Sequence, residues 1–350
     1  MLKITAPFKS KEDVIPLIEA GADELYCGYI LSEISKEYAH LPVFERKGGS
    51  TCNFTDIKEL KNAVTLAHSR NTPVFCAFNG MYVKAQYTLL RKMIRHLEQT
   101  DLDAYIVADM GLLLTLKGMK TKKEIFVSSF VPLFNFEAVA FYRNFGVSRV
   151  ILDRQVSFET MQVLCADFPD LDFEAFVLHL LCVNIDGFCT FAHIGATART
   201  PFSAAQGNRS QADQCQLFTT FDYRSPGDAC CLRYSVEAIG ASSGEPVHNG
   251  EVSPTFFKHL VDGVECGACA MYDFMKTGIK SVKIVGRQMV VEENIKSTKF
   301  IKAAADILEK NKQINRQDYI EQVQTLYRET YGYKKPCRGN NCYHPEVLIK

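Results

Sequence analysis

Short apolar runs alternate with amphipathic segments along most of the chain. The first unit has an apolar run at Leu2–Ala6, a helical pattern after the capping-box pair Ser10 and Asp13, and a second apolar run at Glu24–Gly28. Similar runs predict six further strands, at Pro73–Phe78, Ala104–Ala108, Ile125–Ser128, Arg149–Leu152, Phe173–Val177 and Ser281–Val285. Amphipathic helices are predicted between most of them, at about 56–70, 84–99, 111–118, 135–145 and 157–168.

The serial strand–helix order defines the fold class. Parallel strands need crossovers of about a dozen or more residues, so this order favours an α/β protein with a TIM-like (β/α)8 barrel or a distorted relative of it. An open doubly wound sheet is the alternative. Gly, Ser, Pro, Asn and Cys replace the helical pattern between about 182 and 273. We therefore expect a barrel at 1–290 with a cysteine-rich insertion before the last strand, because long irregular insertions in compact domains are usually functional.

Residues 291–350 are expected to form a helical extension. A stripe of apolar and aromatic residues at helical spacing is typical of an outer helix packed on the barrel. Its members are Tyr319, Ile320, Val323, Leu326 and Tyr327.

Composition narrows the function classes. The 350 residues are 47% hydrophobic, and 40 basic and 40 acidic residues cancel, so no general basic field attracts nucleic acid. RNA binding would rest on a local basic groove or on a protein partner. No run reaches the roughly 20 apolar residues of a membrane span, and the amino terminus lacks a signal-peptide pattern, so we expect a cytoplasmic protein. In that reducing compartment, 13 cysteines favour metal binding or reactive thiols over disulfides.

Eight of the cysteines form close groups in the second half of the chain: Cys182 and Cys189, Cys230 and Cys231, Cys266 and Cys269, and Cys337 and Cys342. Thiolates bind zinc or iron–sulfur clusters, usually four at a time. Only Cys266 and Cys269 have the spacing of a zinc knuckle, so the spacing favours an iron–sulfur cluster over zinc and over redox or structural thiols. Cys27, Cys76 and Cys165 lie among apolar neighbours and are expected to be small core residues.

Several motifs carry a resemblance to a known family. The spacing of Glu174, Phe176, Cys182, Gly187 and Cys189 is similar to the signature of the collagenase-like peptidase family, the unassigned group numbered thirty-two. The segments Arg149–Arg154 and Ser281–Arg287 resemble two of its strand motifs, and Ala20–Gly28 fits its amino-terminal motif. The resemblance spans nearly residues 1–290. It implies a TIM-like barrel and a [4Fe–4S] site that serves oxygen-independent hydroxylation of tRNA, ribosomal RNA or a quinone precursor.

The resemblance also implies a ligand set. It assigns the cluster ligands to Cys182, Cys189, one of Cys230 and Cys231, and Cys266. An insertion between about 207 and 228 leaves open which of the adjacent pair is the third ligand.

Other residues near the cysteines depart from the family pattern. His179 and Leu180 replace small residues before the first cysteine, and Cys269 has no place in a four-ligand scheme unless it replaces its neighbour Cys266. The tail pair, Cys337 and Cys342, has no place either; it is a second metal site or a pair of solvent-facing thiols.

Polar residues end several of the predicted strands, where TIM barrels carry their chemistry. They are Asn79, Asp109, Ser128, Ser129, Asp153, Arg154, Glu174 and Arg287. Arg154 and Arg287 could hold a carboxylate or phosphate with their forked guanidinium groups, and Asp109 and Glu174 could act as acid or base. These four are the predicted catalytic residues, and they suit a nucleotide or a small carboxylate or aromatic substrate.

Three function classes follow. The leading hypothesis is an iron–sulfur protein that supports hydroxylation of RNA or of a small aromatic precursor. The second is a protease, although there is no zinc-protease helix motif and the pattern at Gly240–Gly244 continues into a loop where a nucleophile elbow needs a helix. The third is a binding module without turnover, stapled by zinc or a cluster.

Overall fold

The computed structural model describes residues 2–31, 33, 52–182, 185–188, 234–239, 246–252, 264–332 and 342–349. The chain forms two compact units. One joins Met1–Cys189 to Gly263–Lys350, and the other is Thr190–Asp262. The carboxyl-terminal helices therefore belong to the same unit as the strands that precede the insertion, and the insertion is a unit of its own. No helix in the described part of the chain is long and apolar enough to cross a membrane.

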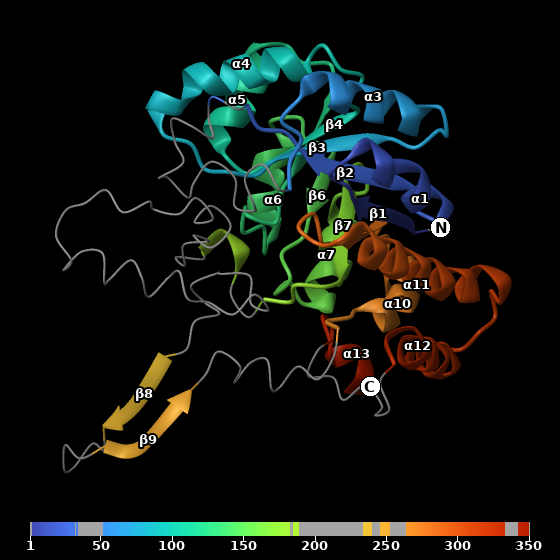
Figure 1. Ribbon diagram of the computed structural model, residues 1–350. Helices are drawn as coiled ribbons and strands as arrows, with labels where there is room; N and C mark the ends of the chain where they lie inside the picture. The colour runs from blue at the N-terminus through green and yellow to red at the C-terminus, as the bar shows by residue number, and fades with distance from the viewer. Residues whose placement is uncertain are drawn as a thin grey trace, which may run out of the picture. The chain divides into compact units, whose positions relative to one another are not determined.

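Eight parallel strands close into a barrel in the order β1-β10-β7-β6-β5-β4-β3-β2 (Figure 1). They are β1 (Lys3–Pro7), β2 (Glu24–Gly28), β3 (Val74–Phe78), β4 (Ala104–Val107), β5 (Glu124–Val127), β6 (Arg149–Ile151), β7 (Asp172–Leu178) and β10 (Ser281–Ile284). All eight predicted strands are present within one or two residues of their expected bounds. The TIM-like barrel is thus confirmed, and the open doubly wound sheet is excluded because the ladder closes between β1 and β2.

Helices follow most strands and form the outer layer. They are α1 (Val14–Glu19), α3 (Ile57–His68), α4 (Tyr87–Leu97), α5 (Met110–Gly118), α6 (Phe136–Arg143), α7 (Phe158–Asp167) and α10 (Met271–Thr277). Several begin at a side chain that accepts a hydrogen bond from a free backbone N–H of the first turn, as Asp56, Asp109, Asn135 and Ser157 do. Their buried faces carry Leu, Val, Ile and Met, so the core lies between this layer and the barrel.

Side chains along the strands alternate between the barrel interior and the helical layer. Tyr26, Phe75 and Phe126 belong to a cluster inside the barrel, whereas Cys27 and Cys76, their neighbours, face the outer core. Cys27 and Cys76 are fully buried and lie opposite each other in the β2–β3 ladder. The prediction that they are small core residues is confirmed.

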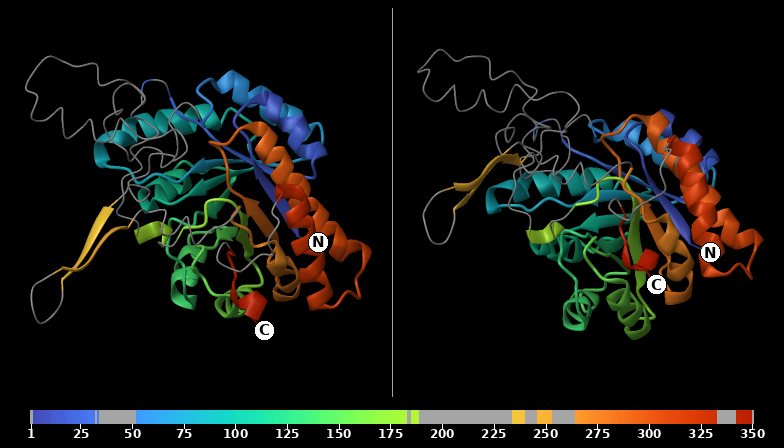
Figure 2. Two further views of the ribbon diagram at one scale, coloured as in Figure 1. Left: turned by 60° about the horizontal axis from the view of Figure 1, so that its bottom comes forward. Right: turned by 90° about the horizontal axis from the view of Figure 1, so that it is seen from below.

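Two long helices complete the barrel unit. α11 (Val291–Lys310) and α12 (Arg316–Tyr331) lie side by side along one flank of the barrel (Figure 2). The predicted apolar stripe packs inward, and Tyr319 and Tyr327 donate hydrogen bonds to the carbonyl oxygens of Ala268 and Val264 at 3.1 and 2.6 Å. After α12, residues 342–349 return to the barrel and end in the short helix α13 (Glu346–Ile349).

The insertion contains regular structure that the sequence pattern did not predict. β8 (Tyr234–Ile239) and β9 (Pro246–Val252) pair as an antiparallel hairpin. The Gly240–Gly244 pattern lies between them, outside the described residues. Because a strand follows it where a nucleophile elbow needs a helix, the hairpin agrees with the expectation that this is no elbow.

Candidate active site at the carboxyl end of the barrel

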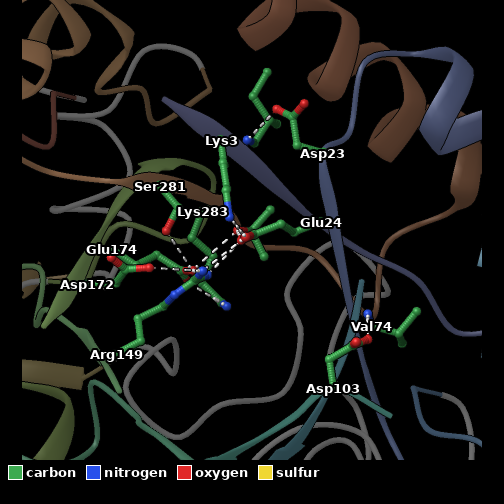
Figure 3. Close-up of polar contacts among 12 residues, drawn as sticks. Lys3, Asp23, Glu24, Val74, Asp103, Arg149, Asp172, Glu174, Ser281 and Lys283 are labelled. Atoms are coloured by element: carbon green, nitrogen blue, oxygen red, sulfur yellow. Dashed lines mark hydrogen bonds and ion pairs between the residues drawn. The ribbon is translucent and has the colours of Figure 1, made fainter. Parts of the chain in front are cut away.

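A network of buried charges fills the barrel interior toward the amino-terminal ends of the strands (Figure 3). Arg149 donates two hydrogen bonds to Glu24, at 2.6 and 2.9 Å, and a third to Glu174 at 3.0 Å. Lys283 donates to the other oxygen of Glu174 at 2.8 Å. Hydroxyl groups of Thr5 and Ser281 complete the contacts of Glu174, at 3.2 and 3.1 Å.

This arrangement corrects the predicted position of Glu174. The residue is the third of seven in β7 and 1% exposed, so the prediction that it lies at the strand end is wrong. Burial alone would raise the pKa of Glu174, but the charges of Lys283 and Arg149 outweigh it and hold that pKa below its ordinary value. Glu174 is thus an ionised partner in an ion-pair network. Its predicted catalytic role stays a prediction.

Arg154 lies where it was expected, directly beyond the end of β6. Its guanidinium carbon is 4.0 Å from the centre of the Phe176 ring inside the barrel, and it forms an ion pair with Asp186. Asp186 also accepts a hydrogen bond from Ser129 at 2.9 Å. The side chain of Arg154 is only 7% exposed, and its Nε has no hydrogen-bond partner among the described residues. A buried guanidinium with a spare donor is a group that can still bind a ligand.

Asp153, the neighbour of Arg154, is a buried carboxylate just beyond the end of β6. It is 2% exposed, and its carboxylate accepts the backbone N–H groups of Gln155 and Asp186, both at 2.8 Å. Burial raises the pKa of Asp153, although these two hydrogen bonds and the nearby Arg154 act against the increase. The sequence placed Asp153 at the strand end without giving it a role. Its raised pKa makes it a stronger candidate than Glu174.

Arg287 lies at the end of β10, and a close fit holds it there. Its Nη1 donates to Asn53 at 2.7 Å, and both residues are buried. A Cβ on Gly28 would lie 1.8 Å from the Asn53 oxygen and 2.2 Å from Arg287 Nη1. Only glycine at the end of β2 therefore leaves room for this pair. Asn53 was not predicted, because nothing in the local sequence connects it to a residue so far along the chain.

Arg154 and Arg287 both influence the same aromatic ring inside the barrel. Burial raises the pKa of Tyr26, and the charges of Arg287 and Arg154 both work against that increase. Asn79, at the end of β3, adds a buried side-chain oxygen without a partner among the described residues. We call Asn53, Asn79, Asp153, Arg154 and Arg287 the mouth cluster.

Asp109 has a structural role at the start of α5. It follows β4, but its carboxylate caps α5 by accepting Leu112 N–H at 2.7 Å, and it accepts the Tyr87 hydroxyl at 2.6 Å. These contacts point the carboxylate toward the helical layer. The prediction of an acid or base at Asp109 stays untested, and the structure shows a helix cap there.

The carboxyl-terminal segment contributes an aromatic side chain to the same interior. Tyr343 is 4% exposed and belongs to the cluster that lines the barrel. Its ring lies nearly parallel to that of Phe176, with centroids 6.4 Å apart, and its hydroxyl donates to the carbonyl oxygen of His179 and accepts from Arg154. Tyr343 was missed because it lies in a polar tail without periodic pattern.

The backbone at the end of β7 is strained just before Cys182. His179 and Leu180 have φ angles of 64° and 52°, in the left-handed region that favours glycine. Each costs about 1–3 kcal/mol relative to an ordinary conformation. The family resemblance implies small residues at these positions, and the left-handed backbone gives a physical reason why glycine would suit them. His179 is buried, with its Nε2 2.6 Å from Ser297 Oγ.

Two of the predicted cysteine ligands lie in the described part of the mouth. The Cys182 carbonyl accepts a hydrogen bond from Gln155 at 2.5 Å, next to Arg154. Cys266 extends the barrel edge, because it forms a bridge with Leu178 at the end of β7. Its sulfur accepts the backbone N–H of Ala268 at 3.4 Å, a contact that suits a thiolate.

The donor set fits a metal or cluster in chemistry, and the described residues supply part of it. Among them, no group of three or more His, Cys, Asp or Glu residues is arranged to hold a metal. Cys189, Cys230, Cys231 and Cys337 lie outside the described residues. Cys269 is buried in the middle of η7 (Ala268–Ala270), and Cys165 is a partly buried thiol of α7 whose pKa burial raises to about 12.

Fold and site together define a TIM-like barrel with buried arginines and cysteines at its carboxyl end. The chain belongs to peptidase family U32, whose family model matches residues 9–337. It is 27% identical over 217 residues to a 23S rRNA 5-hydroxycytidine synthase of Escherichia coli, covering 62% of this chain and 29% of that protein. It is 24% identical over 214 residues to a tRNA hydroxylation protein P of Helicobacter pylori, covering 61% of this chain and 46% of that protein.

Another relative bears a different name. An uncharacterized protease of Methanocaldococcus jannaschii is 27% identical over 193 residues, covering 54% of this chain and 43% of that protein. This chain thus spans less than half the length of these three relatives. A solved U32 peptidase structure is similar with a TM-score of 0.38 and 15% identity, covering 51% of this chain and 69% of that one. The fold assignment rests on the closed strand order.

Proposed function

We propose that this protein is an iron–sulfur protein that supports hydroxylation of a base of tRNA or ribosomal RNA, with the oxygen atom and the two oxidising equivalents supplied by a second substrate other than O2. One observation carries the proposal: the buried Arg154 stacks on Phe176 inside the barrel, and its neighbour Gln155 bonds to the Cys182 segment, in a family whose relatives include RNA hydroxylation proteins. A protease would need a nucleophile beside an available base. His179 is instead bonded to Ser297 inside the protein, where both side chains are buried.

The shape of the site restricts how RNA would reach it. The groups that could contact a substrate lie at the end of an eight-stranded barrel, whose interior admits groups of side-chain size. A base within a duplex cannot reach such a site, so the target nucleotide must be single-stranded or turned out of its stack. The chain has no net charge, so surface attraction to phosphates would be weak and the local arginines would matter more.

The mouth cluster supplies binding and proton-transfer groups. Arg154 would bind a carbonyl or phosphate oxygen with its free Nε, and the Asn79 oxygen would accept from an exocyclic or ring N–H. Asp153, whose pKa burial raises, would accept or hold a proton within the site. A bound cluster would supply an electron-transfer or Lewis-acid centre at the same end of the barrel.

The test compares modified nucleosides in cells with and without the gene. We expect at least one hydroxylated pyrimidine to disappear from digested tRNA or ribosomal RNA when the gene is deleted, measured by mass spectrometry of the two RNA fractions. Unchanged nucleosides together with lost quinones would replace RNA with a small aromatic precursor as substrate. Unchanged nucleosides and quinones would contradict hydroxylation altogether.

Complementation with glycine variants tests the site itself. Gly28→Ala should lower the modified nucleoside by about tenfold or more, because the added methyl group overlaps Asn53 and Arg287. Gly118→Ala is the matched control, since a Cβ there meets no atom within 4 Å. Equal modification by the two variants would show that the Arg287 pair has no role in the reaction.

A further inference from the structure

The short turn η4 (Asp186–Phe188) carries an exposed aromatic side chain beside the mouth cluster. Phe188 is 67% exposed, more than any other large apolar side chain in the described part of the protein. It lies two residues after Asp186, which forms the ion pair with Arg154 and donates its backbone N–H to Asp153 at 2.8 Å. Single exposed apolar residues are common on proteins, but this one lies on a turn that is bonded to the candidate site.

Contacts on the inner side of η4 hold the turn in place. The Asp186 carboxylate accepts a hydrogen bond from Ser129 at 2.9 Å. A Cβ on Gly187 would lie 2.6 Å from the carbonyl oxygen of Phe130, so only glycine allows the turn to lie this close to that backbone. The turn that carries Phe188 is therefore fixed on the protein, and its ring is presented to the outside without further ordering.

Other exposed apolar side chains also follow the carboxyl ends of strands. Met81 and Val83 follow β3, and Val290 follows β10. The remaining exposed large apolar side chains of the described residues lie on helices of the outer layer or directly after one. Phe188 is thus the aromatic member of a group of exposed apolar residues at the carboxyl end of the barrel. A flat ring in such surroundings suits the face of a nucleobase.

RNA in the proposed function has such a base to offer. When the target base turns out of its stack to enter the barrel, the neighbouring base loses a stacking partner. An aromatic side chain beside the mouth can replace that partner for any of the four bases, because each has a π-face. Stacking needs no charge, so it suits a chain in which basic and acidic residues cancel.

We infer that Phe188 stacks on the base next to the target nucleotide and forms a binding platform for single-stranded RNA at the mouth of the barrel. This inference rests on the proposed function and specifies the form of its RNA substrate. Phe188 contacts the neighbouring base, whereas Arg154 and Asp153 face the target base itself. The ion pair between Arg154 and Asp186 fixes the two contacts relative to each other.

The experiment measures binding of a short dye-labelled single-stranded RNA of mixed sequence to the full-length chain, purified without oxygen, by fluorescence anisotropy. Phe188→Ala should raise the dissociation constant by about tenfold, the size of effect expected when one stacked base loses its aromatic partner. Phe188→Leu should weaken binding equally, because it keeps an apolar side chain but lacks the flat ring. Phe188→Trp should bind as the wild type does. A duplex of the same sequence should bind all four proteins equally, because its bases are already stacked.

The matched control is a second exposed phenylalanine far from the strand ends that form the mouth. Phe141 is 51% exposed and lies near the end of α6, so Phe141→Ala should bind the single strand as the wild type does. Phe188→Ala should unfold at the same urea concentration as the wild type, because it changes an exposed side chain.

Wild-type binding of the single strand by Phe188→Ala or by Phe188→Leu overturns the stacking platform. Equal weakening by Phe188→Ala and Phe141→Ala overturns it as well. If Phe188→Ala lowers the modified nucleoside in cells but leaves RNA binding unchanged, Phe188 contacts a protein partner and the RNA platform is wrong.

The proposed function is judged separately, by the nucleosides of the deletion strain. Weaker binding by Phe188→Ala together with unchanged nucleosides and quinones in that strain would support the RNA platform and contradict hydroxylation. Lost nucleosides together with unchanged binding by Phe188→Ala would support hydroxylation and contradict the platform.

Discussion

The two ends of the barrel interior use similar residues in opposite ways. Toward the amino-terminal ends of the strands, every carboxylate oxygen of Glu24 and Glu174 accepts at least one hydrogen bond, and only the Nε of Arg149 has no partner among the described residues. At the carboxyl end, Arg154 and Asn79 have buried polar atoms without partners in the described chain. His179 and Leu180 add left-handed backbone there.

This difference indicates that the amino-terminal end of the barrel stabilises the fold and that the carboxyl end carries the function. A buried charge is tolerated only when it is paired, so the amino-terminal network, in which every carboxylate oxygen of Glu24 and Glu174 is paired, is a structural unit. Strain and unsatisfied polar atoms cost stability and persist where something else requires them. The carboxyl end of the barrel meets this description, and chemistry in TIM barrels occurs at that end.

Glu174→Gln should produce the largest effect on stability. The change keeps the shape of the side chain but removes one of two negative charges that face Arg149 and Lys283. Breaking a buried ion pair in this way should lower the free energy of unfolding by about 3–5 kcal/mol. Urea denaturation followed by circular dichroism measures it.

The control is an ion pair on the surface. In the Arg143–Asp170 pair, the two side chains are 48% and 49% exposed, so Asp170→Asn should change the free energy of unfolding by only about 0–1 kcal/mol. If Glu174→Gln were as mild as this control, the amino-terminal network would not be the structural unit described above.

The eight strands and the six helices between them could be predicted because each is a local pattern. The depth of a side chain within the barrel could not be predicted. Alternation along β7 shows that Glu174 points inward, but it does not show how far from the mouth of the barrel Glu174 lies. The hairpin was not predicted, although Tyr234–Ile239 alternates largely apolar and polar residues. The residues around it are rich in turn formers, and such a composition is typical of a loop. Asn53 and Tyr343 are site residues only through contacts between distant segments.

Lowering the pH should destabilise the folded protein because His179 is buried at the carboxyl end of the barrel. Burial, helped by the charge of Lys296, lowers the pKa of His179 from 6.5 to about 4. The unfolded chain therefore binds a proton at a higher pH than the folded chain, and stability falls as the pH drops from about 6.5 to about 4. The loss should reach about 3 kcal/mol.

His179→Asn isolates this contribution. Asparagine tolerates the left-handed backbone and does not titrate, so the variant pays a constant cost of lost packing at every pH. The difference in free energy of unfolding between wild type and variant should shrink as the pH falls from 6.5 to 4. A difference that is constant over this range would show that His179 titrates normally.

The smallest effect on stability should come from Tyr343→Phe. This variant tests whether the Tyr343 hydroxyl takes part in the site or only stabilises the fold. The change removes the hydroxyl that bonds to His179 and Arg154 but keeps the ring on Phe176, so it should lower the free energy of unfolding by about 1 kcal/mol.

Tyr105→Phe is the matched control, because Tyr105 is fully buried and donates to Glu98 at 2.7 Å on the outer side of the barrel. Both variants should lose similar stability in urea. Only Tyr343→Phe should also lower the modified nucleoside, by about fivefold, because it frees Arg154 from one fixed position. If both variants lowered modification equally, the tail would stabilise the barrel without taking part in its site.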